Sequence, residues 1–201
     1  MFTGIIEASG KIIGLRPDKS NIQVFVESPI SNELKIDQSV AHDGVCLTVD
    51  ELGPGWHRCT LIRETLDKTH FSDARQGEQI NLERSIRFDS RMDGHFVQGH
   101  TDTTLTCLAR SDRRGSWVFE FTLPSPFKSL VIPKGSIALN GVSLTISGLL
   151  NDSFEVSIIP YTYEHTNFQF IHAGRRVNAE FDLLGKYIQR SLELRSSQGL
   201  R

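Results

Sequence analysis

The stretch Ser39-Val-Ala-His-Asp-Gly-Val-Cys-Leu-Thr-Val49 recurs as Ser136-Ile-Ala-Leu-Asn-Gly-Val-Ser-Leu-Thr-Ile146, and this repetition decides the architecture. Six of the eleven aligned positions are identical, and the copies are offset by 97 residues. The same offset pairs Glu83 with Glu180 without a gap. Because repeats at a fixed period mark duplicated structural units, the 201-residue chain consists of two tandem copies and a short C-terminal extension.

Each copy has the pattern of short β-strands. Ile22, Val24 and Val26 alternate with polar residues, and aromatic residues alternate in the same way over 117–121. Strong helical periodicity is absent inside the copies, and Gly, Pro, Asn and Asp separate the alternating stretches. Closing such strands into a barrel removes the exposed sheet edges. We therefore expect two tandem barrels.

The C-terminal extension differs from the repeats. From about Leu183 to Leu194, apolar residues recur mostly every three or four positions, with charged residues between them. This spacing predicts an amphipathic helix. Its apolar face needs a cover, which leaves two alternatives at this point: oligomerisation, or docking on the neighbouring barrel.

Composition excludes several partners and compartments. The chain carries 22 Lys and Arg against 24 Asp and Glu, so it has no strong field for nucleic acid or anionic lipid. No apolar run reaches the roughly 18 residues of a membrane span, and residues 1–7 lack the basic and apolar pattern of an export signal, so we expect a protein that is not exported. Cys46, Cys59 and Cys107 form no Cys-x-x-Cys pair, which favours free thiols in a reducing cytoplasm.

Several site classes lack support in the sequence. The seven histidines make no zinc signature, so we expect no metal. The stretch Gly141-Val-Ser-Leu-Thr145 lacks the final glycine of a hydrolase nucleophile elbow. There is no Gly-x-Gly-x-x-Gly motif and no phosphate-binding loop, which argues against a nucleotide cofactor.

The repeated Gly-Val-(Cys or Ser)-Leu-Thr motif is the strongest candidate for binding. A strand that turns Val45 and Leu47 inward presents Cys46 and Thr48 on its other face, and Ser143 and Thr145 follow in the second copy. Such residues form either a plain polar outer face or a matched pair of sites for two similar ligands.

Three further residues have both a structural and a functional interpretation. His100 is either structural or a proton-transfer group, since histidine titrates near neutral pH. Lys134 precedes a glycine and suits a turn. Asp182 stands directly before the predicted helix and suits an N-cap.

Four motifs in order resemble the riboflavin synthase family of the alpha-chain type. They are Met1-Phe-Thr-Gly-Ile-Ile-Glu7, the two repeated motifs, and Gly94-His-Phe-Val-Gln-Gly-His100. The resemblance implies an all-β fold of two six-stranded Greek-key barrels plus a C-terminal α-helix. It implies a first lumazine-binding barrel over 1–94, a second over 95–182, and an oligomerisation helix and tail over 183–201.

The resemblance also implies an activity. The chain is then a transferase in which two molecules of 6,7-dimethyl-8-ribityllumazine exchange a four-carbon unit, giving riboflavin and 5-amino-6-ribitylaminouracil without a cofactor or metal. It implies a homotrimer in the cytoplasm, with association with lumazine synthase as a further expectation. Relatives that bind lumazine or flavin as optical antennae are the alternative. An oligonucleotide-binding barrel would need a basic, aromatic face that is not found here.

The resemblance carries candidate residues onto this chain. The implied catalytic residues are Phe2, Thr3, Cys46, His100, Ser143, Thr145 and Asp182. An N-terminal strand reaching the site adds Gly4, Ile5 and Ile6. The first pocket is expected to contain Ser39, Cys46, Leu47, Thr48, Thr60, Leu61, Ile62, Arg63, Glu64 and Thr65. The second pocket is expected to contain Gly99, His100, Thr101, Lys134, Ser143, Leu144, Thr145, Ile158, Ile159, Pro160, Tyr161, Thr162 and Tyr163.

Overall fold

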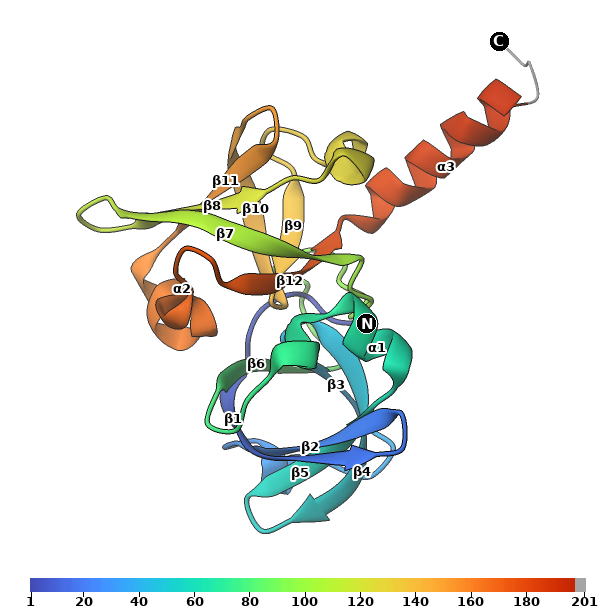
Figure 1. Ribbon diagram of the computed structural model, residues 1–201, viewed down its shortest axis with the longest axis vertical. Helices are drawn as coiled ribbons and strands as arrows, with labels where there is room; N and C mark the ends of the chain where they lie inside the picture. Colours follow the sequence, from blue (N-terminus) through green and yellow to red (C-terminus); the bar gives the residue numbers. More distant parts are fainter. Residues whose placement is uncertain (198–201) are drawn as a thin grey trace.

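Two closed, six-stranded antiparallel barrels and one C-terminal helix make up the computed structural model, which describes residues 1–197 (Figure 1). The expected all-β fold with a terminal helix is confirmed. Residues 198–201 of the expected tail lie outside the described residues. The first barrel consists of β1 (Ala8–Asp18), β2 (Asn21–Glu27), β3 (Ser39–His42), β4 (Val45–Gly53), β5 (Trp56–Leu61) and β6 (Gln79–Arg84). The second consists of β7 (Thr103–Asp112), β8 (Trp117–Thr122), β9 (Ser136–Leu139), β10 (Val142–Leu149), β11 (Ser153–Ile158) and β12 (Arg176–Phe181).

The two barrels repeat the same topology in detail. The first closes in the order β1-β2-β5-β4-β3-β6, and the second closes through the equivalent strands in the same cyclic order. Register shifts recur at matching places, between Val49 and Glu51 on β4 and between Ile146 and Gly148 on β10. Bulges bend a strand, and closing a barrel requires such bends. The duplication in sequence is therefore a duplication of whole barrels.

Short helices follow the same strand in each copy, a feature that the weak helical periodicity did not indicate. They are α1 (Arg63–Lys68) and α2 (Pro160–His165), each followed by a 3₁₀ turn, η2 (His70–Asp73) and η4 (Asn167–Phe170). The other 3₁₀ segments are η1 (Ser31–Glu33) and η3 (Ser125–Leu130). Local chemistry explains the helices: Pro160 stands at the first turn of α2, and Lys68 pairs with Glu64 one turn away on α1.

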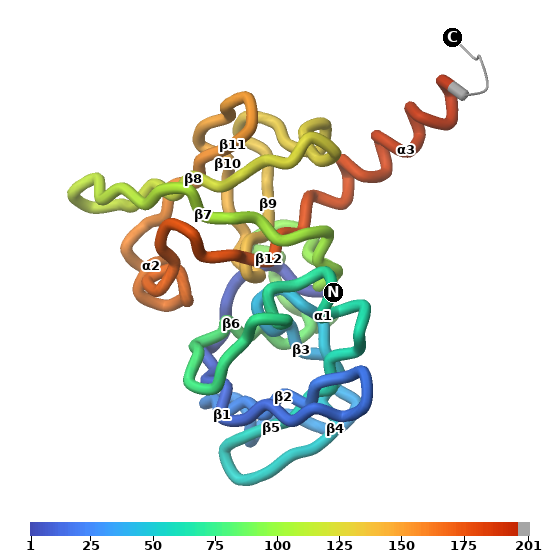
Figure 2. Tube along the Cα trace, in the orientation of Figure 1, coloured from blue at the N-terminus to red at the C-terminus, as the bar shows by residue number. Residues whose placement is uncertain are grey.

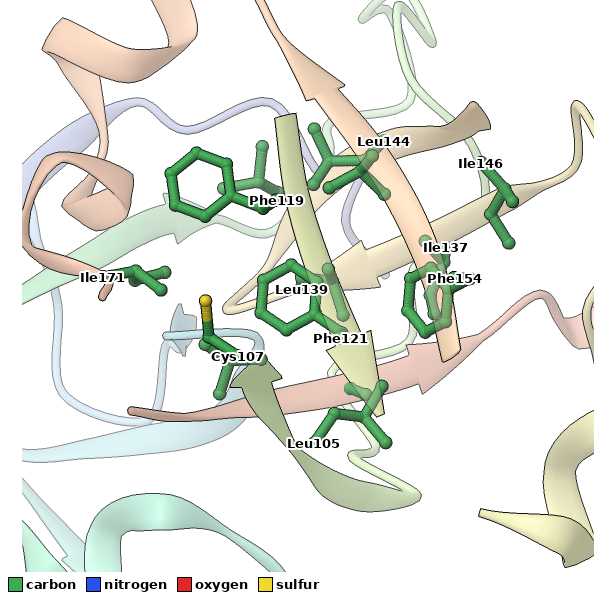
Figure 3. Packing of buried hydrophobic residues seen from close by; sticks show 14 of the residues in the cluster. Leu105, Cys107, Phe119, Phe121, Ile137, Leu139, Leu144, Ile146, Phe154 and Ile171 are labelled. Carbon is green, nitrogen blue, oxygen red and sulfur yellow. The ribbon is translucent and has the colours of Figure 1, made fainter. Parts of the chain in front are cut away.

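Each barrel has its own apolar core. Figure 3 shows the second, where Phe119, Phe121 and Phe154 meet Leu139 and Leu105 between the strands. The first core is built mainly from aliphatic residues on the inward positions of β1 to β6. Fully burying one such side chain contributes about 1.5–3 kcal/mol. The alternating inward residues seen in the sequence thus account for both cores.

The barrels meet along an interface that the repeated turns build. Asn81 Nδ2 donates to the Asn140 carbonyl at 2.9 Å, and Asn178 Nδ2 donates to the Asp43 carbonyl at the same distance. All four residues are buried. A methyl group on Gly44 would lie 2.6 Å from the Gly141 nitrogen, so the two turns approach too closely for a side chain. The glycine of the repeated motif is therefore required by barrel packing.

The long helix α3 (Leu183–Ser197) leaves the end of β12 and projects away from both barrels (Figures 1 and 2). Leu184, Ile188 and Leu192 are 57–68% exposed along it. Lys186 Nζ forms an ion pair with Asp102 Oδ2 at 2.6 Å near its start. The helix thus forms as the sequence predicts, but beyond its first turns it does not dock on its own barrel. No helix within residues 1–197 combines the length and hydropathy of a membrane span.

Candidate active site

Two short segments cross between the barrels and meet each other there. Phe2 and Val97 form an antiparallel bridge, with Phe2 N donating to Val97 O at 2.7 Å and Val97 N donating to Phe2 O at 3.1 Å. Beyond the bridge, Gly4 O accepts a bond of 2.7 Å from Ser143 N, and Gly99 O accepts one of 2.8 Å from Cys46 N. Each segment therefore ends against the outward motif of the opposite barrel.

The first groove lies beside Cys46 on β4. Its volume is about 210 Å³, and it is lined by Val45, Cys46, Glu64, Thr65, Lys68, Thr69, Gly99, His100 and Thr101. Cys46 is half-buried, whereas the His100 side chain is exposed. Lys68 and Glu64 form an exposed ion pair of 2.7 Å at its edge. The groove offers a thiol, hydroxyls and an imidazole around a shallow opening.

The region beside Ser143 on β10 is the counterpart of the first groove in the repeat, and we call this region the second groove. Ser143 Oγ lies 2.7 Å from the ring nitrogen Nδ1 of His95, and the backbone nitrogen of His95 donates to Thr3 O at 3.1 Å. Burial lowers the pKa of His95 below its usual value of 6.5, while the charge of Asp182 opposes that shift. The neutral ring thus prevails at physiological pH, and its Nδ1 is able to accept the Ser143 proton.

Two buried carboxylates hold the crossing segments in place. Glu83 accepts hydrogen bonds from the Thr3 nitrogen at 2.6 Å and the Gly4 nitrogen at 2.9 Å. Glu180 does the same for the nitrogens of Gln98 to His100 over 2.6–2.9 Å. Burial raises the pKa of both carboxyls, and these hydrogen bonds oppose the rise. Glu83 and Glu180 are aligned in the repeat, so one device orders both segments.

One expected placement is wrong. The turn Gly99–Thr101 was expected in the second pocket with Ser143, but it lies in the first groove against Cys46. The reason is that the segment that precedes β7 crosses to the first barrel and contacts Cys46 there before the chain enters the second barrel. Gly4 conversely lies against Ser143, where a methyl group on it would be 2.6 Å from Ser143 Cβ.

The strands sort the remaining candidates by direction. Thr48 and Thr145 are exposed on the outer face, as the alternation predicts. Leu47 and Leu144 point into the cores, and so do Leu61 and Ile158, so their side chains belong to the barrel interiors. Ser39 lies opposite Thr48 on β3.

Two other candidates have partners away from the grooves. The Phe2 side chain is fully buried between the barrels with Ala41, Val97 and Ala138. Thr60 donates its hydroxyl proton to Asp50 at 2.5 Å.

The remaining candidate residues of both pockets lie in or directly before the helices α1 and α2. Ile62 before α1 and Ile159 before α2 are more than half exposed, as is Tyr161. Tyr163 stacks on Trp117 with ring centroids 3.8 Å apart. Arg63, Glu64, Thr65, Pro160 and Thr162 complete these two turns. Exposed apolar residues beside polar groups suit a flat, apolar ligand or a partner surface.

Lys134 and Asp182 have the structural roles considered for them. Lys134 adopts φ +66° in the turn before β9, and its nitrogen donates to Ile146 O at 3.0 Å. Asp182 Oδ1 accepts a 3.0 Å bond from the Leu184 nitrogen, which caps α3. Asp182 also acts on the second groove through its charge near His95.

Sequence reasoning did not select His95, Glu83 and Glu180, which the structure places at the candidate site. A buried acid on a strand, repeated in both copies, is the signal that identifies the glutamates. His95 lies outside the repeated motifs, and its link to Ser143 spans 48 residues. Only the folded chain brings that pair together.

Comparison with known proteins agrees with this geometry. The family model described as "Lumazine binding domain" matches twice, over residues 3–85 and 98–182. Riboflavin synthase of Mycobacterium tuberculosis is 38% identical over 195 residues, covering 94% of this chain and 97% of that protein. Riboflavin synthase of Bacillus subtilis is 36% identical over 194 residues, covering 96% and 90%.

Solved structures show the same fold. A crystal structure of LumP complexed with 6,7-dimethyl-8-(1'-D-ribityl) lumazine matches with a TM-score of 0.83 at 18% identity, covering 90% of this chain and 99% of that one. LumP complexed with riboflavin matches with a TM-score of 0.85 at 20% identity and the same coverage. With two matched domains and relatives above 30% identity over nearly its full length, the chain belongs to the riboflavin synthase family.

Proposed function

We propose that this protein is a transferase that converts two molecules of 6,7-dimethyl-8-ribityllumazine into riboflavin and 5-amino-6-ribitylaminouracil. One lumazine donates a four-carbon unit and the other accepts it, so the atoms balance without an oxidant or cofactor. The observation that carries this proposal is the pair of equivalent polar sites on barrels of identical topology: the groove at Cys46 and its counterpart at Ser143. A reaction between two copies of one compound calls for two similar sites.

Positioning supplies a large part of the rate. Binding both rings converts a bimolecular encounter into a nearly unimolecular step, which is able to lower the barrier by up to about 7–11 kcal/mol. Glu83 and Glu180 hold the crossing segments, which in turn bond to the backbone of Ser143 and Cys46, so the polar groups are ordered before substrate arrives.

The Ser143–His95 pair supports the proton transfer. The reaction removes a proton from the C7 methyl of one lumazine, and a hydroxyl alone is a poor base. With its Nδ1 at 2.7 Å from Ser143 Oγ, neutral His95 accepts the serine proton as the serine oxygen takes the substrate proton. Cys46 holds the equivalent place in the first groove, where His100 is the nearby imidazole.

We also propose that the enzyme is a homotrimer in which the first groove of one subunit faces the second groove of another. The first groove, at about 210 Å³, is smaller than the roughly 300–1,000 Å³ of typical ligand pockets, which fits a site completed by a facing barrel. An apolar cavity of about 960 Å³ lies between α3 and η3, lined by Leu130, Ile132, Leu184, Ile188 and Leu192 among others. Covering it with a second copy accounts for the exposed helix.

Cytoplasmic location and association with lumazine synthase complete the proposal. The free thiols Cys46, Cys59 and Cys107 support the location, and the family resemblance supports the association.

The test is an anaerobic incubation of the metal-free protein with 6,7-dimethyl-8-ribityllumazine alone, followed by absorbance and chromatography. Riboflavin should form at half the rate of lumazine loss, together with an equal amount of the aminouracil. Tight binding of lumazine without any riboflavin would contradict the enzymatic proposal and favour an antenna role.

A further inference from the structure

Three side chains with metal-binding atoms meet in the core of the first barrel, apart from both grooves. His42 ends β3, while His57 and Cys59 are two residues apart on β5 and share its inner face. All three side chains are fully buried. Their donor atoms lie within 4.8 Å of one another. The two Nε2 atoms are 2.8 Å apart, and Cys59 Sγ is 3.8 Å from His42 Nε2.

The fold does not require this polar cluster. At the equivalent positions of the second barrel the chain has Leu139, Phe154 and Val156, all buried in the second core. The same architecture therefore closes around purely apolar side chains. Polar groups lose their hydration when they enter a core, and although hydrogen bonds satisfy both imidazoles, the second barrel shows that the fold does not need them.

Hydrogen bonds from surrounding groups orient the two imidazoles. His42 Nδ1 lies 3.1 Å from Val40 O, and because a carbonyl only accepts, Nδ1 carries the proton and Nε2 of the neutral ring holds a lone pair. His57 Nδ1 lies 2.9 Å from Ser31 Oγ, which is 2.8 Å from Ser28 Oγ. Because His42 Nε2 holds a lone pair, His57 Nε2–H donates to it across 2.8 Å, and Ser31 Oγ donates to His57 Nδ1. When a metal ion replaces the proton between the rings, His57 can hold its proton on Nδ1, where Ser31 Oγ accepts it. This second-layer bonding is typical of metal-bound histidines.

We propose that His42 Nε2, His57 Nε2 and Cys59 Sγ form a three-coordinate site for Cu(I). Charge selects the ion: one thiolate and two neutral imidazoles around Cu(I) leave the core without net charge. Zn²⁺ would leave one positive charge in an apolar interior and would call for a fourth ligand. Cu(I) is a soft ion that thiolate and imidazole ligands suit.

The geometry needs only a small adjustment. With metal–nitrogen distances of about 2.0 Å and metal–sulfur distances of about 2.3 Å, planar three-coordination places nitrogen and sulfur roughly 3.7 Å apart and the two nitrogens roughly 3.5 Å apart. The observed 3.8 Å between His42 Nε2 and Cys59 Sγ already fits, whereas the two Nε2 atoms must move apart by about 0.7 Å from their 2.8 Å separation. As the Cu–S bond forms, the thiol proton of Cys59 is released and the metal stays Cu(I).

The experiment is an anaerobic competition between the full-length protein and the coloured Cu(I) complex of bicinchoninate. The wild type should remove one equivalent of Cu(I). Cys59→Val and His42→Leu, which copy the second barrel, should abolish that uptake. Ser31→Ala keeps all three ligands but removes the bond that orients His57, and it should weaken affinity roughly 10- to 100-fold. Cys107→Val and Cys46→Ser, each lacking one of the other thiols, should bind as the wild type does.

Three results of the competition would overturn the site. Undiminished uptake by folded Cys59→Val, or loss of uptake in Cys46→Ser, would place the copper elsewhere. Displacement of Cu(I) by Zn²⁺ at equal concentration would contradict the choice of ion. X-ray absorption of the wild-type copper protein tests the site without any variant: a shell of two nitrogens and one sulfur is expected, and any other ligand set contradicts it.

Discussion

Ser143 Oγ and His95 Nδ1 lie 2.7 Å apart, although Ser143 belongs to a barrel strand and His95 to the segment between the barrels. The same segment is bonded to the N-terminal segment, since the backbone nitrogen of His95 donates to Thr3 O. His95, the proposed proton acceptor of the second groove, is thus positioned by the junction of the barrels. The proposed catalytic pair therefore depends on how the barrels pack.

Loss of the proton relay should reduce turnover more than binding. We expect Ser143→Ala and His95→Gln each to lower kcat by about 10²- to 10⁴-fold, with a smaller change in lumazine affinity. The double variant should be little worse than either single variant, because the two residues act as one unit. Steady-state kinetics and fluorescence titration with lumazine measure both quantities. Equal losses in rate and affinity would contradict a catalytic role, and Thr145→Ala tests the neighbouring hydroxyl in the same way.

The pH dependence of the reaction should report His95. Protonated His95 cannot accept the serine proton, so the rate falls as pH drops through the pKa of this residue. Because burial lowers that pKa from 6.5, the acidic limb should lie below pH 6.5. Asp182→Asn removes the charge that opposes the shift and still caps α3, so it should move the limb to lower pH. A limb that stays in place in the Asp182→Asn profile of kcat/KM would exclude His95 as its source.

Substituting Gly4 should disturb the second groove specifically. Gly4 has φ +76°, and a methyl group on it would lie 2.8 Å from the Ser143 nitrogen, so Gly4→Ala must push the N-terminal segment away. We expect a loss of more than the roughly 1–2 kcal/mol of backbone strain alone, together with reduced activity. Gly77→Ala is the matched control, since Gly77 has φ +96° but nothing within 4 Å of the added carbon. Thermal unfolding and activity assays should separate the two variants.

The apolar face of α3 should hold the oligomer together. Replacing Leu184, Ile188 and Leu192 with Ser, or ending the chain before Leu183, should yield monomers whose barrels remain folded, with strongly reduced activity. Arg190→Ala changes an exposed side chain of the same helix outside that face and serves as the control. Analytical sedimentation measures the oligomeric state of each variant. Trimers from the truncated chain would mean that another surface drives assembly.

Local sequence decided much of this protein. The repeat of Ser39–Val49 as Ser136–Ile146 specified two copies of one unit, and alternation such as Val45, Leu47, Val49 specified which residues enter each core. The apolar spacing after Asp182 specified the terminal helix. These features depend on contacts within a strand, a hairpin or a helix turn, where neighbours along the chain set the outcome.

Only the tertiary structure decided how the grooves are assembled. The crossing of Phe2–Gly4 and Val97–Gly99 placed His100 beside Cys46 and His95 beside Ser143, which no spacing along the chain indicates. Glu83 and Glu180 fix that crossing through hydrogen bonds to residues about 80 positions away. Such bonds form only once two barrels have closed and excluded water from their junction, so the partners are chosen by packing between barrels and not by local pattern.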